Sequence, residues 1–195
     1  MTTTVSGLFD TPADATAAVQ DLRTLGIPHD DISVVSSNVE TDTDASDVAV
    51  DASAGAGLGA AFGGLGGLLT GLGIVAIPGV GPVVAAGWLV ATAAGAAAGA
   101  IVGGAAGGIV GALTESGVSE RDAHVYAEGV RRGGTLVTAR VADDKVELAR
   151  TALQRSRAVD LERRRADYET SGWTSFDPAA PVPPRDRVGL NNNLV

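Results

Sequence analysis

The chain has 195 residues, a formal net charge of −9 and no cysteine. Hydrophobic residues make up 45% of it, enough for a core, but only 4% are aromatic and 27 are glycine. The acidic balance argues against a nucleic-acid partner, because binding to a phosphate backbone needs a basic face. The absence of cysteine excludes disulfides and cysteine-based metal sites. The first residues lack the basic and apolar regions of a signal peptide, so we expect a cytoplasmic domain.

Residues 1–39 are expected to form a first βαβ half. A loosely alternating strand over Thr3–Phe9 precedes a helix over about residues 13–25, whose apolar residues recur at helical spacing. Gly26 and Pro28 follow as typical helix-ending residues, and a second strand covers Asp31–Val35. Residues 40–53 form an acidic linker. Its aspartates, Asp42, Asp44 and Asp47, lack the glycine and final glutamate of a calcium loop.

An uncharged stretch runs from Ala52 to Thr114, and glycine recurs in it at every fourth position in two runs, with Ala91 in one glycine position of the second run. Between the runs lies a turn sequence, Ile77 to Pro82. This spacing predicts a glycine-zipper helical hairpin over residues 54–114, with helices at Gly55–Ile77 and Val83–Leu113 that pack through small-residue faces. The residues expected to mediate helix packing and oligomerisation are Gly55, Gly59, Gly63, Gly67, Gly71, Gly87, Gly95, Gly99, Gly103, Gly107 and Gly111.

The glycine stripe is too wide for one straight partner helix. A four-residue step drifts by about 40° around a helix, so the second run sweeps about 240°. We therefore expect several helices to meet and the chain to form a homo-oligomer. The first predicted helix, roughly 34 Å long, also matches the ~30 Å core of a bilayer.

Two surroundings for the hairpin remain open. Our leading prediction is a membrane-associated protein that also self-associates, with the lipid bilayer as a second partner. The alternative is a soluble cytoplasmic homo-oligomer with the hairpins buried between chains. Ala91–Ala100 contains no Leu, Ile, Val or Phe, and neither end of the hairpin is flanked by Lys or Arg, which favours the alternative.

Residues 115–165 are expected to supply a helix and the second βαβ half. A capping box at Ser119–Asp122 begins a helix that continues to about Arg132. A strand over Thr135–Val141, a helix to about Arg155 and a short last strand over Ala158–Leu161 follow. The fold class is thus α+β, a ferredoxin-like split βαβ domain with an inserted glycine-zipper helical hairpin. Residues 166–195 form an extended C-terminal tail, whose Trp173 and Phe176 can dock on the domain.

No pattern in the chain predicts catalysis, a cofactor or a metal. His29 and His124 are far apart in the sequence and have no cysteine to complete a metal site. No Lys-Ser/Thr pair follows the glycines, as a phosphate-binding loop requires. The arginine clusters 131–132 and 163–165 are most simply a solvated face, with contact to anionic lipid head groups as the alternative.

Four segments resemble the bacterial general stress protein family of the heat-induced type. They are Leu25–Val35, the glycine-rich block with its turn at Ile77–Pro82, Tyr126–Val137 and Gly172–Pro178. The resemblance covers most of the chain. It implies a stress-linked role in bacteria, often with a membrane or glycine-zipper segment, and it carries no catalytic residues.

Overall fold

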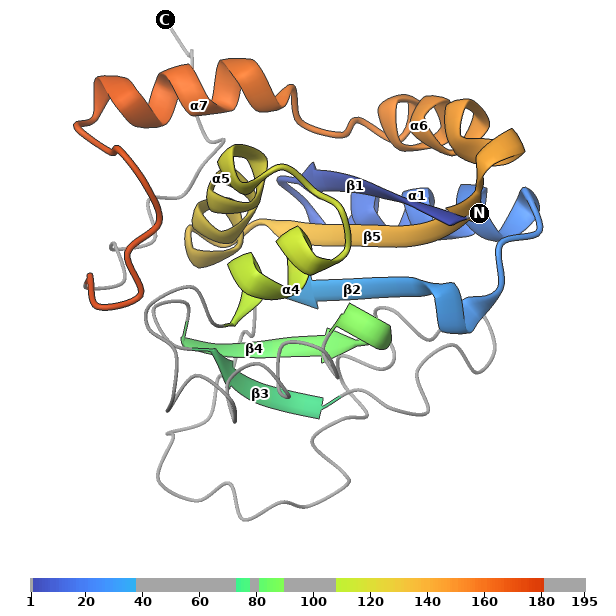
Figure 1. Ribbon diagram of the computed structural model, residues 1–195, viewed down its shortest axis with the longest axis horizontal. Coiled ribbons are helices and arrows are strands. Elements are labelled where there is room, and N and C mark those ends of the chain that lie inside the picture. The colour runs from blue at the N-terminus through green and yellow to red at the C-terminus, as the bar shows by residue number, and fades with distance from the viewer. Residues whose placement is uncertain (1, 38–72, 78–80, 90–107, 181–195) are drawn as a thin grey trace, which may run out of the picture.

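The computed structural model describes residues 2–37, 73–77, 81–89 and 108–180. This part of the chain is mixed α+β, with an antiparallel sheet of order β1-β5-β2-β4-β3 and helices on both faces (Figure 1). The elements are β1 (Thr2–Phe9), α1 (Pro12–Thr24), the 3₁₀ turn η1 (His29–Asp31), β2 (Ile32–Ser36), β3 (Gly73–Ile77), β4 (Gly81–Ala86), α4 (Ile109–Glu115), α5 (Glu120–Arg131), β5 (Thr135–Ala142), the 3₁₀ turn η2 (Asp143–Lys145), α6 (Val146–Arg155) and α7 (Leu161–Thr170).

The elements predicted from local signals are confirmed. The Thr11 side chain caps α1 by accepting a hydrogen bond from the Asp14 N–H at 3.1 Å, and Pro12 occupies the first turn. The Ser119 hydroxyl caps α5 in the same way by accepting from the Asp122 N–H at 3.1 Å. β5 then lies between β1 and β2 and pairs with both. Residues separated by the long insertion therefore share one sheet.

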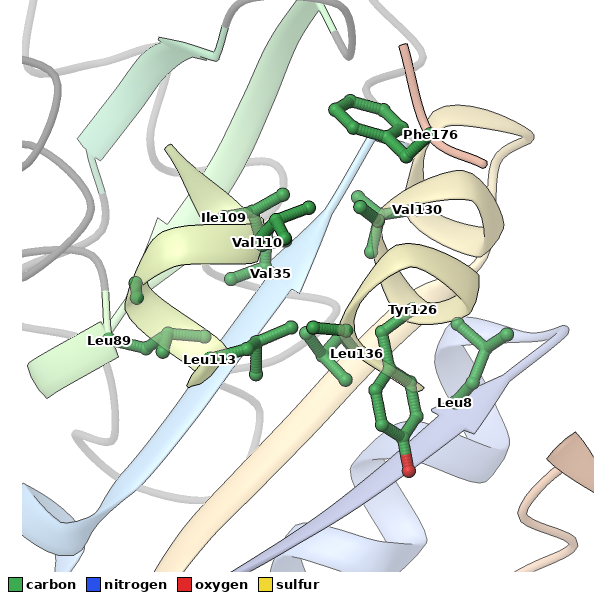
Figure 2. Close-up of a cluster of buried hydrophobic side chains, with 13 residues drawn as sticks. Leu8, Val35, Leu89, Ile109, Val110, Leu113, Tyr126, Val130, Leu136 and Phe176 are labelled. Carbon is green, nitrogen blue, oxygen red and sulfur yellow. The ribbon is translucent and has the colours of Figure 1, made fainter. Parts of the chain in front are cut away.

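Two apolar clusters hold the helices on opposite faces of the sheet. On one face, α1 and α6 pack against β1, β2 and β5 around Phe9, Leu22 and Leu153. On the other face, α4 and α5 bury a second cluster, in which Leu113 and Leu136 lie between the helices and the strands (Figure 2). Both faces of the central strands are thus covered.

The predicted helical hairpin is wrong at residues 73–77 and 81–86, whereas the last residues of its second helix are helical in α4 (Ile109–Glu115). Residues 73–77 and 81–86 are strands that pair with each other, and β4 extends the sheet at β2 with Val34 opposite Ala86. The β-branched residues of this part suit a strand, and the edge of β2 supplies backbone partners that no helix spacing encodes. Gly87 has a φ of 99° and Gly108 a φ of 82°, so one continuous helix over Val83–Leu113 does not form.

The predicted last strand and the start of the predicted tail are also wrong. Asp160 accepts hydrogen bonds from the Glu162 and Arg163 N–H groups, both at 3.1 Å, and so begins α7 where a strand was expected. Residues 166–170 belong to this helix. Beyond it, the expected docking of Phe176 is confirmed, because its side chain is buried in the α4–α5 cluster. The linker at residues 40–53 and the last residues, 181–195, lie outside the described part.

Among the described residues, no helix is both long enough and apolar enough to cross a bilayer.

Candidate binding cleft at the free edge of β1

The outer edge of β1 carries backbone groups that point away from the sheet. The Ser6 carbonyl accepts a hydrogen bond from the Tyr126 hydroxyl at 3.1 Å, and the Leu8 carbonyl accepts one from the Val159 N–H at 2.8 Å. Backbone direction alternates along an antiparallel strand, so even-numbered residues face outward and odd-numbered residues pair with β5. Among the described residues, no hydrogen bond satisfies the outward N–H and C=O of Thr4 or the N–H of Ser6.

A cleft of about 670 Å³ follows this edge. One wall comes from α5 and the start of α7, and the other comes from α6. In Figure 1 the link between α6 and α7 passes along the β1 side of the sheet. The volume is in the range of ligand-binding clefts. The lining residues are Thr4, Val5, Ser6, Gly7, Val118, Asp122, Tyr126, Arg150, Leu153, Gln154, Ala158, Val159, Asp160 and Leu161.

Tyr126 is the most strongly perturbed titratable group of the cleft. Burial of its ring, together with the negative charge of Asp122, raises the pKa of Tyr126 well above its ordinary value. The phenol therefore remains a neutral hydrogen-bond donor, and it fixes the Ser6 carbonyl at the floor of the cleft. The Ser6 hydroxyl oxygen is buried and has no hydrogen-bond partner in the described part of the chain.

Two glycines allow α5 to lie close to β1. A Cβ atom at Gly129 would lie 2.4 Å from Cδ2 of Leu8, and one at Gly134 would lie 2.9 Å from the Gly129 carbonyl oxygen. Only glycine fits this approach, which places Tyr126 over the strand edge. Gly129 and Gly134 stand within one of the segments used for the family resemblance, but nothing in their spacing predicts a cleft.

An ionic cluster on α5 anchors the segment that follows α7. Glu128 is fully buried and pairs with Arg131 at 2.5 Å and Arg132 at 2.6 Å. The guanidinium of Arg132 lies over the ring of Tyr168 at 4.3 Å. Phe176 lies beneath Arg131, 5.5 Å from its guanidinium carbon to the ring centre, and its N–H donates to His124 Nδ1 at 3.2 Å.

The prediction of a solvated arginine face is wrong for most of these side chains. Arg131 and Arg165 are buried, and Arg165 pairs with Asp122 at 2.8 Å. The Nη2 group of Arg164 donates to both carboxylate oxygens of Asp10, with both distances 2.8 Å. These arginines bind carboxylates within the domain because the helices bring the charges together, so they do not form an open basic surface.

The predicted packing glycines fall mostly outside the described residues. Nine of them do so: Gly55, Gly59, Gly63, Gly67, Gly71, Gly95, Gly99, Gly103 and Gly107. Gly111 lies in α4 and is half-buried. Gly87 is not in a zipper helix: a Cβ there would lie 2.4 Å from the Ile32 carbonyl oxygen, so this glycine lets the chain pass close to β2 at the end of β4.

Trp88 also has contacts within the domain. The Trp88 indole N–H donates to the Asp31 carbonyl at 3.1 Å, and the Arg140 guanidinium lies 4.9 Å from the centre of its ring. Trp88 is thus held against the domain by a hydrogen bond and a cation–π contact. In the described ranges, no three His, Asp or Glu side chains gather closely enough to hold a metal ion.

Comparison with known proteins returned no relative. No protein-family model, curated protein or solved structure matches the chain. The resemblance to bacterial general stress proteins therefore stays a prediction. The cleft itself was missed by sequence reasoning. Its one signal was the strand predicted at Ala158–Leu161, since that segment does reach β1 but makes only one backbone bond there.

Proposed function

We propose that this is a non-enzymatic protein that self-associates through its uncharged, glycine-rich stretches at residues 52–72 and 90–107. The observation that carries this proposal is the way in which the domain holds the insertion. β2 precedes the insertion, β3 and β4 add to the same sheet within it, and α4 packs on that sheet at its end. The first stretch therefore ends at β3, and the second lies between Leu89 and Gly108, so both are joined to elements of the same sheet domain.

Composition supports contact between chains at these stretches. They carry no charge and are rich in glycine and alanine, which allow backbones to approach closely. Long uncharged sequences of this composition are typical of segments that bind other protein chains. The strand order β1-β5-β2, with α1 and α6 on one face, supports a ferredoxin-like interpretation of the domain. The family resemblance further implies a stress-linked role, which we include in the proposal.

The second candidate environment for the uncharged stretches is the lipid bilayer. Residues 52–72 are uncharged and about as long as the ~20 residues that span a bilayer. The second predicted span is interrupted, because β4 ends at Ala86 and Gly108 precedes α4. The stretch that remains between these breaks, residues 88–107, is long enough to span, but Ala91–Ala100 within it contains no Leu, Ile, Val or Phe, which suits contact with protein better than contact with lipid. We therefore favour contact between protein chains over insertion of a hairpin.

The proposal is tested by the mass of the full-length protein in solution. Gly99→Leu with Gly103→Leu adds two bulky side chains to the second stretch. We expect at least a tenfold weaker self-association, measured by light scattering after sizing. The control is Ala166→Leu with Thr170→Leu, which places two leucines at exposed positions of α7 with the same four-residue spacing and leaves the oligomer unchanged.

A wild-type protein that is monomeric at all concentrations contradicts self-association. Carbonate and detergent extraction of cells distinguishes the two surroundings. Protein that resists carbonate and needs detergent supports the membrane candidate, and full recovery in the soluble fraction as a large species excludes it.

A further inference from the structure

The cleft has the position and shape of a missing edge strand. The segment after α6 begins such a strand, because the Val159 N–H bonds the Leu8 carbonyl. It ends at once, since Asp160 caps α7 and the chain turns away. We propose that residues Arg185–Leu190 of the same chain bind along β1 in this cleft as an added strand. This inference concerns a different surface from the self-associating stretches and does not depend on them.

The backbone groups that the cleft offers match those of an added strand. Tyr126 and Val159 already satisfy the carbonyls of Ser6 and Leu8. The N–H and C=O of Thr4 and the N–H of Ser6 remain for main-chain hydrogen bonds to a new strand. Alternate side chains of that strand would point to the two walls, one formed by α5 and the start of α7 and the other by α6.

β1 lacks the features that normally protect an edge strand. Its sequence from Thr2 to Phe9 contains no charged residue and no proline. Edge strands in natural proteins are usually short, charged, interrupted by proline or covered by another segment. An eight-residue uncharged edge is therefore expected to have a cover. The walls recess the edge, so a single extended segment fits better than the whole sheet of a second molecule.

The C-terminal segment of the chain can reach this position. Phe176 is fixed on α5 through His124, and the same helix supplies Asp122 and Tyr126 to the cleft. The nine residue steps from Phe176 to Arg185 can extend over up to ~30 Å, so the segment can begin at the neighbouring cleft. A short tether of this kind produces an effective concentration in the millimolar range, so binding within one chain exceeds binding between chains in dilute solution.

The sequence of the segment identifies the part that can pair. Pro181, Pro183 and Pro184 have no N–H to donate, so pairing begins after them. The stretch Arg185–Leu190 contains no proline, and its two arginines and one aspartate make it basic. The cleft lining holds two aspartates and one arginine, but Asp122 already pairs with Arg165, so the charge match with the segment rests on Asp160.

Amide hydrogen exchange of the full-length protein tests the added strand. Val188→Pro removes an N–H and the extended pairing at the centre of the segment. We expect the Thr4 and Ser6 amides to exchange at least ten times more slowly in the wild type than in Val188→Pro. Asn192→Pro, outside the pairing stretch, is the control and should match the wild type. Equal exchange in the wild type and Val188→Pro overturns the proposal.

Disulfide trapping distinguishes the chain's own segment from that of a second copy. The chain has no cysteine, so Thr4→Cys with Val188→Cys introduces the only pair. Under mild oxidation of a dilute sample we expect a cross-linked monomer that forms at least ten times faster than with Thr4→Cys and Asn192→Cys. A cross-linked dimer as the main product, or equal rates for the two pairs, overturns binding within one chain.

Discussion

The two edges of the central strands β1, β5 and β2 are completed in different ways. At β2, the insertion returns as β4 and pairs along Val34–Ser36, and β3 adds a further strand. At β1, only Val159 forms a backbone bond to the edge, and Tyr126 covers one carbonyl with its side chain. One edge is therefore extended by backbone pairing, whereas the other is left as a cleft.

The difference shows how a capping residue competes with an open edge. The segments at residues 81–86 and 158–161 both reach an edge strand. The first stays extended and pairs, and its exit at Gly87 fits closely against β2. The second contains Asp160, whose side chain satisfies two N–H groups of α7, so helix formation takes the chain off the edge after one bond. A single local cap thus decides whether the sheet gains a strand.

The largest expected effect is at the extended edge, with Gly87→Ala. A Cβ there would lie 2.4 Å from the Ile32 carbonyl oxygen, at a φ of 99°. Strain and overpacking together should lower the free energy of unfolding by about 3 kcal/mol. The matched control is Gly117→Ala, at a φ of 93° with nothing within 4 Å, which should cost about 1 kcal/mol. Urea unfolding measures both, and equal costs would mean that the contact of Gly87 with β2 is unimportant.

The second largest effect is the difference in stability between Thr3→Pro and Thr4→Pro, because the N–H groups of these two residues lie on opposite sides of β1. The N–H of Thr3 faces β5 opposite Val141, whereas that of Thr4 faces the cleft. Proline at position 3 removes a ladder bond and should cost about 2 kcal/mol more than proline at position 4. Thr3→Ala controls for the hydroxyl bond to Asp143. If Thr4→Pro is the more destabilising variant, the outward direction of Thr4 is wrong.

The smallest expected loss of stability is that of Tyr126→Phe, which removes the side-chain bond to the outer edge of β1. Loss of the hydroxyl bond to the Ser6 carbonyl should cost about 1 kcal/mol at neutral pH. Because the folded pKa of Tyr126 is raised, the unfolded chain ionises first, and stability is lost as the pH rises above ~10. Tyr126→Phe should remove a slope of up to ~1.4 kcal/mol per pH unit.

The pH dependence has an internal control. Burial also raises the pKa of Tyr168, so Tyr168→Phe should remove its own part of the alkaline loss and leave that of Tyr126. Unfolding at several values between pH 8 and 11 measures both variants. An unchanged slope in Tyr126→Phe would show that its phenol titrates alike in the folded and unfolded chain.

Part of the candidate site was readable from the sequence. The helix that carries Tyr126 and Asp122 follows from the capping box at Ser119, and β1 follows from its alternation and the proline after it. The burial of Glu128 with Arg131 was not readable, because adjacent charges on a helix usually face solvent. The cleft depends on which strand lies at the edge, and strand order is a property of the whole sheet.

The sequence by itself determined the elements whose signals are local: β1, α1 and β2 before the insertion, and α5, β5 and α6 after it. Caps, periodicity and helix-ending glycines act over a few residues, so they can be recognised without a partner. The helix at Leu161–Thr170 also has a local signal in the Asp160 cap, but the apolar residues at 158–161 were interpreted as a strand. Only the tertiary structure decided the strands at residues 73–77 and 81–86 and the open edge of β1. The physical reason is that a strand needs backbone partners from distant residues, and glycine spacing does not reveal whether an edge such as β2 will supply them.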